Sequence, residues 1–251
     1  MLVKKNISFL ILFVILKFTS QLEAQSFGFG CLGFVGGFAG FTYQSYVPAG
    51  LNEFVTTFNS QNESTLTQSL DYFGQTKGFR AGINLFRANF SGFILTAKGF
   101  YQSLSESHDS FEELTSGNAN SNYSLKLKTL GVGVDVGVDI TEFLSWKVLD
   151  GSINFNNAAL TESINSPGSS TEVVYKSPDT KIGYTIGSGF IIDLISNYLT
   201  LEGLAAYSFI NFDKLESDDQ NKIIFNSNNS TDIIEAGGFS AVIQLNVGFP
   251  L

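Results

Sequence analysis

The sequence predicts an all-β protein, an eight-stranded antiparallel up-and-down β-barrel whose strands cross a membrane. Three observations lead to this prediction. Apolar side chains recur at every second position through much of the chain, which is the period of a β-strand. Long polar segments alternate with short ones between the apolar runs. Gly and Phe number 25 each and Pro only 4, a composition that suits strands around a narrow interior.

The first 24 residues are expected to be a cleaved signal peptide. Lys4 and Lys5 precede an apolar run over 9–16, and polar and small residues then lead to Ala24, the usual layout of a secretory signal. The run is shorter than the roughly 20 residues of a membrane-spanning helix. We therefore assign 1–24 to the signal peptide and 25–251 to a single barrel domain.

Alternating segments account for the strands. In 131–139 four valines alternate with Gly and Asp, and 27–41, with six glycines, is also interpreted as strand because glycine disfavours a helix. Similar alternation occupies 79–85, 93–102, 181–192, 199–209 and 239–249. One face is almost uncharged and the other holds Gly, Ser, Thr and Asn, as expected for lipid outside and a polar lumen inside. A soluble, lipocalin-like barrel with the apolar face inside is the alternative fold.

The connections alternate in length, which fixes the predicted topology. Long polar segments cover 44–75, 104–122, 160–177 and 213–232, whereas short ones fall at 86–90, 141–145 and 193–197. Four long outer loops and three short periplasmic turns imply eight strands. The sheet must close, because an open edge in lipid would leave backbone groups unsatisfied. Eight strands enclose a space that side chains can fill.

Two sets of residues are candidates for a structural or functional site. Charged residues on the inferred inner face must be paired and are expected to form a network that plugs the lumen, with a lumen lined for small ions as the alternative: Arg80, Lys98, Asp135, Asp139, Asp150, Lys181 and Glu202. Aromatic residues near the strand ends are expected to form interfacial girdles, with carbohydrate stacking as the alternative: Tyr43, Tyr101, Tyr123, Trp146 and Tyr198.

The whole pattern resembles the small bacterial outer-membrane barrels. Signal peptide, eight alternating segments, alternating loop lengths and a last strand ending at Phe249 are similar to the OmpA-like and OmpX-like barrels and to the outer membrane protein beta-barrel domain group of Bacteroidetes. The resemblance implies a monomer in the bacterial outer membrane that contacts its lipid, its lipopolysaccharide and its assembly machinery. Pro250 and Leu251 follow Phe249, whereas such chains often end on an aromatic residue.

No motif indicates catalysis, a cofactor or a metal, so we expect a protein that is not an enzyme. Gly28–Gly33 matches a dinucleotide-binding pattern but lacks the strand and helix that it requires. His108, the only histidine, lies in a polar segment beside Ser107 and Ser110, and catalytic partners usually come from different elements. Acidic pairs at 112–113 and 218–219 are interpreted as solvated rather than as Ca²⁺ ligands.

Charge and pattern together leave three functional hypotheses. Without residues 1–24, 11 basic and 22 acidic side chains give a net charge of −11, which should repel nucleic acid. The first hypothesis is a structural or interaction barrel that contacts an unknown extracellular partner through its outer loops. The second is a narrow porin-like channel for ions or small solutes. The third is a barrel enzyme that modifies lipid or peptide, with His108 as its base.

Overall fold

The computed structural model describes residues 36–90, 92–115, 117–195, 198–217, 225 and 231–248, with no account of the side chains of 88–90. Several features of the sequence lie outside these residues: the predicted signal peptide, the Gly28–Gly33 motif, Asp218, Asp219 and Phe249. Within the described part, no helix is long and apolar enough to cross a membrane.

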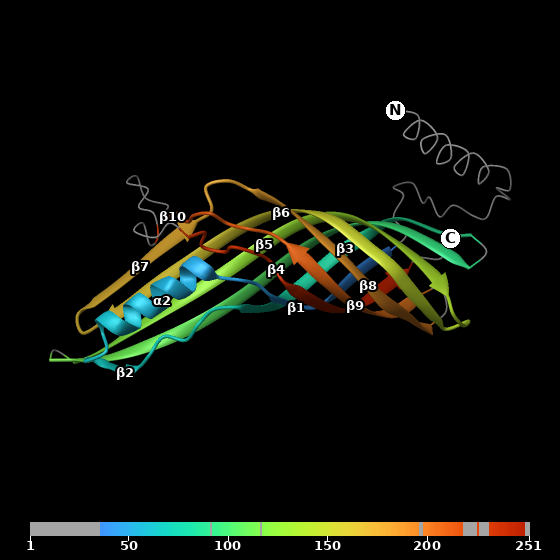
Figure 1. The fold of residues 1–251 in the computed structure, drawn as a ribbon. Helices are drawn as coiled ribbons and strands as arrows, with labels where there is room; N and C mark the ends of the chain where they lie inside the picture. The colour runs from blue at the N-terminus through green and yellow to red at the C-terminus, as the bar shows by residue number, and fades with distance from the viewer. Residues whose placement is uncertain are drawn as a thin grey trace, which may run out of the picture.

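Eight strands close an antiparallel barrel, which confirms the predicted fold class (Figure 1). In barrel order they are β1 (Gly36–Ser45), β3 (Gln75–Phe90), β4 (Phe93–Leu114), β5 (Gly117–Asp139), β6 (Leu144–Ser166), β8 (Lys181–Ile195), β9 (Leu199–Phe209) and β11 (Phe239–Gly248). Each strand pairs with the next, and β11 returns to β1. Smaller elements are α2 (Ala49–Gln61), β2 (Leu66–Gln68), β7 (Ser169–Lys176) and β10 (Glu216–Ser217).

The short turns lie at one end of the barrel and the long connections at the other, where Figure 1 shows α2, β7 and β10. Two predicted loops are wrong in detail, because 104–122 and 160–177 are largely strand. β4 and β5 stay paired out to Leu114 and Gly117, and β6 pairs with β7 out to Ser166 and Ser169. Most of the polar residues that suggested loops face outward on this extended sheet, while the inner face carries the apolar residues together with Glu106, His108 and Glu162.

We call this region the outer extension: β4, β5 and β6 beyond Gln102, Thr129 and Asn156, together with α2, β2, β7 and β10. The remaining strands and strand segments are the barrel body. The outer extension continues the strands of the barrel body without a break in their hydrogen-bonded pairing. It therefore stands on the barrel as a rigid continuation of its wall.

The two regions place apolar side chains on opposite faces, and β5 shows the change. In the barrel body the outward Leu130, Val132 and Val134 are at least 55% exposed. Further along β5, Leu125 and Leu127 are buried on the inner face, and Lys126 and Lys128 face outward. The strand alternation continues, but the chemistry of its faces is exchanged between residues 127 and 130.

The exchange occurs at matching positions on three neighbouring strands. On β4 the outward residues change from Tyr101 to Ser103, and on β6 they change from Phe155 to Asn157. Strand register aligns Tyr101 with Leu130 and Leu130 with Phe155. On these three strands the boundary between an apolar exterior and a polar one therefore follows the strand register.

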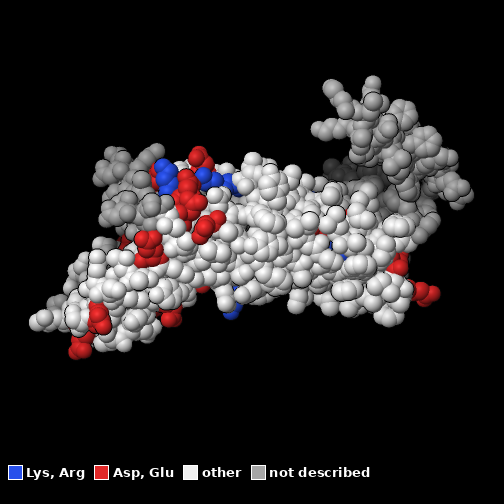
Figure 2. All heavy atoms as spheres, viewed as in Figure 1, with Lys and Arg blue, Asp and Glu red and all other residues white. Residues whose placement is uncertain are grey.

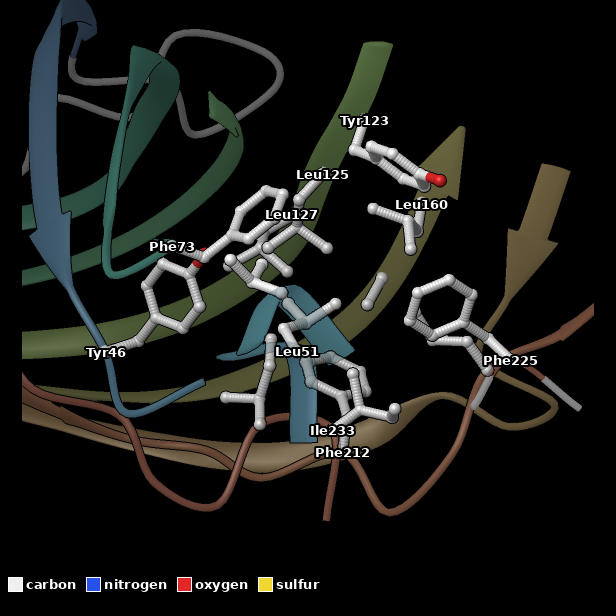
Figure 3. Close-up of a cluster of buried hydrophobic side chains, with 14 of the residues drawn as sticks. Tyr46, Leu51, Phe73, Tyr123, Leu125, Leu127, Leu160, Phe212, Phe225 and Ile233 are labelled. Atoms are coloured by element: carbon white, nitrogen blue, oxygen red, sulfur yellow. The ribbon is translucent and has the colours of Figure 1, made fainter. Parts of the chain in front are cut away.

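The helix α2 fills the inner face of the outer extension. Leu51 and Val55 are fully buried in one apolar cluster with Leu125 and Leu160 of the strands (Figure 3). Burying each such side chain contributes roughly 1.5–3 kcal/mol. The helix thus gives the outer extension an apolar core of the kind found in soluble proteins.

Two asparagines of α2 fix the segment that follows the helix. Asn59 hydrogen-bonds both the N–H and the C=O of Leu70, at 2.9 Å each. Asn52 does the same to Phe73, at 2.9 and 3.1 Å. Buried backbone groups need such partners, and these four bonds supply them. The connection 46–74 is accordingly a folded element and not a loose loop.

Candidate functional site

Five ionisable side chains meet inside the barrel body, and each is at most 4% exposed: Lys98, Asp135, Lys147, Asp150 and Glu202. The ammonium group of Lys98 contacts Asp150 and lies 3.5 Å from Asp135. That of Lys147 lies 3.2 Å from Asp135 and 3.3 Å from Asp150, and it also contacts Glu202. We call these residues the lumen network. Burial removes the hydration of these charged groups, and their mutual pairing offsets that cost in free energy.

A β-bulge explains how β6 contributes two residues to the lumen network. The register between β6 and β8 shifts between Lys147 and Asp150, so both side chains face inward. The two residues between them, Val148 and Leu149, both face outward, 40% and 47% exposed. Strict alternation had assigned Asp150 to the inner face and so missed Lys147. Two adjacent apolar residues between two charges are the signal that could have revealed the bulge.

Neutral side chains complete the hydrogen bonding of Glu202. Its second oxygen accepts hydrogen bonds from the amides of Gln244, at 3.2 Å, and Asn246, at 3.4 Å. Asn246 also donates to the Thr200 hydroxyl, at 3.0 Å. A cavity of about 10 Å³ lies beside these groups, which is room for about one water molecule. The interior here is filled almost entirely by side chains.

Arg80 forms a second layer, closer to the outer extension. Its register partner Gln102 lies four residues beyond Lys98 along β4. The guanidinium group of Arg80 lies 3.6 Å from the centre of the Phe100 ring, a cation–π contact. The ring fits because Gly131 has no side chain, and a Cβ there would lie 2.2 Å from the ring. With Arg80, three basic and three acidic side chains are buried in the barrel body.

Besides Arg80, two predicted members lie outside the lumen network. Asp139 is exposed at the turn end of β5 and accepts a 2.7 Å hydrogen bond from Ser145. Lys181, 27% exposed at the outer end of β8, pairs with Asp213 at 2.7 Å. Both residues follow the inward alternation, but they stand at strand ends where the barrel opens. Alternation predicts the face of the strand on which a residue lies, but not its position along the barrel axis.

Four of the five predicted girdle residues lie on the exterior. Tyr43 and Tyr101 face outward near the boundary where the exterior chemistry changes, while Trp146 and Tyr198 lie near the turn end. Further exposed aromatic residues accompany them: Phe79, Phe93, Phe143, Phe190, Tyr207, Phe209 and Phe239.

The girdle assignment of Tyr123 is wrong. This residue is 2% exposed on the inner face of the outer extension, beyond the exchange of faces. Its hydroxyl donates a 2.8 Å hydrogen bond to Glu162. Burial, followed by the Glu162 charge, raises the pKa of Tyr123 above its usual value.

His108 belongs to a buried polar contact of the outer extension. Its ring hydrogen-bonds Glu106 at 3.0 Å and packs edge-to-face on Phe73 at 4.7 Å. Ser107 faces the opposite side of the strand and accepts a hydrogen bond from Asn122. Glu106 also accepts the Tyr46 hydroxyl at 2.6 Å. Burial, with Glu106 as the second cause, raises the pKa of Tyr46.

Comparisons with known proteins find solved structures of low similarity. No protein-family model matches the chain, and no curated protein matches its sequence. Neisserial surface protein A is 13% identical, with a TM-score of 0.41 over 85% of this chain and 97% of that one. Ail, the attachment invasion locus protein of Yersinia pestis, is 12% identical, with a TM-score of 0.38 over 86% and 99%.

The outer membrane protease OmpT from Escherichia coli is a third similar structure. It is 10% identical, with a TM-score of 0.40 over 86% of this chain and 94% of that one. The barrel assignment does not depend on these similarities. It rests on the eight paired strands and their closure between β1 and β11.

Proposed function

We propose that this chain is a bacterial outer-membrane barrel with a closed lumen, which serves as a structural or interaction protein through its outer extension. The exterior of the barrel body supports the membrane position. The outward apolar belt on β4 runs from Phe93 to Tyr101, nine residues, and a membrane-spanning strand needs about 9–11. In Figure 2 most of the visible charge lies over the half of the molecule that carries the outer extension, with a small group near the turn end.

The lumen network is the observation that best supports a closed lumen. Its two lysines and three carboxylates touch one another across the interior, from β4, β5, β6 and β9. The Arg80–Phe100 layer lies beyond it, followed by the apolar core of the outer extension. An ion would have to break buried ion pairs and then cross an apolar cluster. Both steps cost free energy, so we expect that ions do not pass through the barrel.

The outer extension supports a role in contact rather than catalysis. It is an ordered sheet with its own core, and its outward face carries Ser, Asn and Thr side chains. In this proposal that face meets an extracellular partner or ligand, in adhesion or in support of the envelope. Residues 1–24 are removed during secretion, and the assembly machinery inserts the remaining chain as a monomer.

A narrow channel is the second candidate function. The 10 Å³ cavity beside the lumen network is lined by charged residues that include Arg87, Lys98 and Glu202. It supports a path for water-sized particles from the turn end. Opening it further would require the lumen network to rearrange.

Single-channel recording in a planar bilayer tests the proposed function. The mature chain, residues 25–251, is refolded in detergent and added to the bilayer, with a boiled sample as the control. Insertion without current is the expected result. Steady discrete currents would overturn the closed lumen and favour the channel.

A pair of variants sharpens this experiment. Lys147→Ala combined with Glu202→Ala removes one ion pair of the lumen network and should produce small or flickering currents. Lys126→Thr combined with Lys128→Thr, on the exterior, should leave the bilayer silent. Equal silence of the two variants would show that the Arg80–Phe100 layer and the apolar core of the outer extension are sufficient to close the barrel.

A further inference from the structure

A second β-bulge, in β3, turns an arginine into the lumen. The register between β3 and β4 shifts between Asn84 and Phe86, with Leu85 as the extra residue. Arg87 therefore pairs with Thr96, which faces the lumen and is 5% exposed. Without the bulge, Arg87 would lie on the exterior, because it follows the outward Leu85 by two residues. Bulges are frequent where a side chain is redirected toward a functional site.

The cavity of about 10 Å³ beside the lumen network lies against this bulge. Asn84, Arg87 and Thr96 line it together with Lys98. Asn84 pairs in register with Lys98, as Arg87 does with Thr96, and the Cβ atoms of such a pair are about 5 Å apart. We call Asn84, Arg87 and Thr96 the bulge site.

The bulge site holds hydrogen-bond donors that the protein does not use. Within the described part of the chain, none of its side chains forms a hydrogen bond or an ion pair. The amides of Gln244 and Asn246, which line the same cavity, both donate to Glu202. A guanidinium group has five N–H donors and no acceptor, so Arg87 requires an acceptor that these neighbours do not supply.

The interior of the barrel body carries one more positive charge than negative charge. Its buried groups are three basic and three acidic, and the half-buried Arg87 adds a fourth basic group. Asp139 and Asp193 stand at the turn end of β5 and β8, and neither lines the cavity. A charge in a partly dehydrated site is costly unless a counterion joins it. The bulge site therefore favours a partner with a single negative charge.

The size of the cavity selects among anions. Room for about one water molecule admits an anion of one atom, whereas phosphate and sulfate are too large. We propose that the bulge site binds one chloride ion. The guanidinium group of Arg87, the amide of Asn84 and the hydroxyl of Thr96 donate to it, and the ammonium group of Lys98 adds positive charge nearby.

The chloride ion would enter from the turn end and stop at the bulge site, because the lumen network lies beyond it. This inference is separate from the proposed contact role of the outer extension and does not depend on it. It also gives a reason for the β3 bulge, which otherwise places an unpaired guanidinium group inside the barrel.

The test is the line width of the chloride NMR signal, which broadens when the ion exchanges with a site on a large particle. The refolded mature chain in zwitterionic micelles is titrated with chloride against a gluconate background, and broadening that saturates is expected. Arg87→Gln should reduce the broadening about tenfold, as the loss of a charge-assisted hydrogen bond predicts. Lys77→Gln is the matched control, because it removes the same charge from an exposed position of the same strand. It should leave the broadening unchanged, and Arg87→Lys should recover part of it.

Crystals grown in bromide locate the ion. An anomalous peak among Asn84, Arg87 and Thr96 is expected, and a water molecule alone at that position would overturn the proposal. Equal loss of broadening in Arg87→Gln and Lys77→Gln would reduce the effect to net charge and overturn it as well. Competition by sulfate at equal ionic strength would contradict a site that holds an anion of one atom.

Folding of each variant is scored first, by tryptophan fluorescence. Thr96→Val removes one donor with little change in shape, so it replaces Arg87→Gln if that variant does not fold. Thr96→Val should weaken the broadening because one hydrogen bond to the ion is lost. Unchanged broadening in a folded Thr96→Val would count against the bulge site.

Discussion

The barrel body and the outer extension share three strands but differ in which face is apolar. In the barrel body of β5, Val132 and Val134 face out and Asp135 faces in. In the outer extension of the same strand, Leu125 and Leu127 face in and Lys126 faces out. The backbone is alike in both, so the difference comes from the solvent around each part. In the proposed membrane position, one strand is fitted to lipid at one end and to water at the other.

The difference extends to what fills each interior. The barrel body holds charges and amides that satisfy one another, such as Lys147 with Glu202 and Gln244 with Asn246. The outer extension holds a helix packed on leucines. A polar interior is specific but sensitive to the loss of one partner, whereas an apolar core loses stability in proportion to the cavity created. Substitutions of matched chemistry can separate these two behaviours.

The largest expected effect is in the lumen network. Lys147→Met should lower the free energy of unfolding by about 3–5 kcal/mol, because it leaves Asp135 and Glu202 buried with less compensation. Urea unfolding in lipid vesicles, followed by tryptophan fluorescence, measures the loss. Lys128→Met is the control on the exterior and should change stability by less than about 0.5 kcal/mol. Similar losses for both would refute the distinction between the buried and exposed lysines.

The next effect is in the core of the outer extension. Leu125→Ala should cost about 2–5 kcal/mol, because its cavity would form in a fully buried cluster. The loss should be local, so hydrogen exchange should accelerate in the outer parts of β4 and β5 and not in the barrel body. Leu130→Ala, on the same strand but outward, leaves no cavity and should cost much less. Uniform acceleration across both regions would mean that they unfold as one unit.

A smaller effect is expected at the layer between the regions. Gly131→Ala should cost about 1–3 kcal/mol, because the added Cβ meets the Phe100 ring in a packed interior. Gly151→Ala is the control, since no atom lies within 4 Å of a Cβ built there. Combining Gly131→Ala with Phe100→Leu should recover part of the loss in urea unfolding. A double variant no more stable than Gly131→Ala alone would contradict the contact.

The sequence predicts the barrel better than the outer extension, for a physical reason. Val132, Val134 and Val136 all face outward, so a run of alternating apolar residues stands out. In 104–122 the outward face is Ser, Asn and Asp, and the composition resembles a loop. The inward leucines that make it a sheet are few in each strand, and α2 comes from a different segment. Register and long-range packing therefore had to come from the structure.

The candidate site shows the same limit. Alternation placed Lys98, Asp135 and Glu202 correctly on the inner face of the strands. It missed Lys147 because a bulge changes the alternation within β6. It misplaced Tyr123 because the apolar side chains move from the outer to the inner face along β5, and the two-residue period continues unchanged through that point. The first error arises where a bulge interrupts the pattern, and the second where the pattern continues but the environment changes.

The smallest expected effect concerns the exposed pair at the edge of the outer extension. The hydrogen bond from Lys181 lowers the pKa of Asp213 below its usual value. A carboxyl group with a depressed pKa adds stability at pH values above its unfolded pKa and loses it as the pH falls through the folded pKa. Because this pair is largely solvated, Asp213→Asn should cost at most about 0.5 kcal/mol at pH 7.

Matching pH measurements complete this last comparison. At low salt, the free energy of unfolding of the wild-type chain should fall by this small amount between pH 6 and pH 2. The free energy of unfolding of Asp213→Asn should not show this fall. Lys181→Met should remove most of the same pH dependence, because it deletes the donor and keeps the carboxylate. High salt should reduce the difference, since the pair is accessible to solvent. A loss as large as that of Lys147→Met would show that exposure does not separate the ion pairs of the two regions.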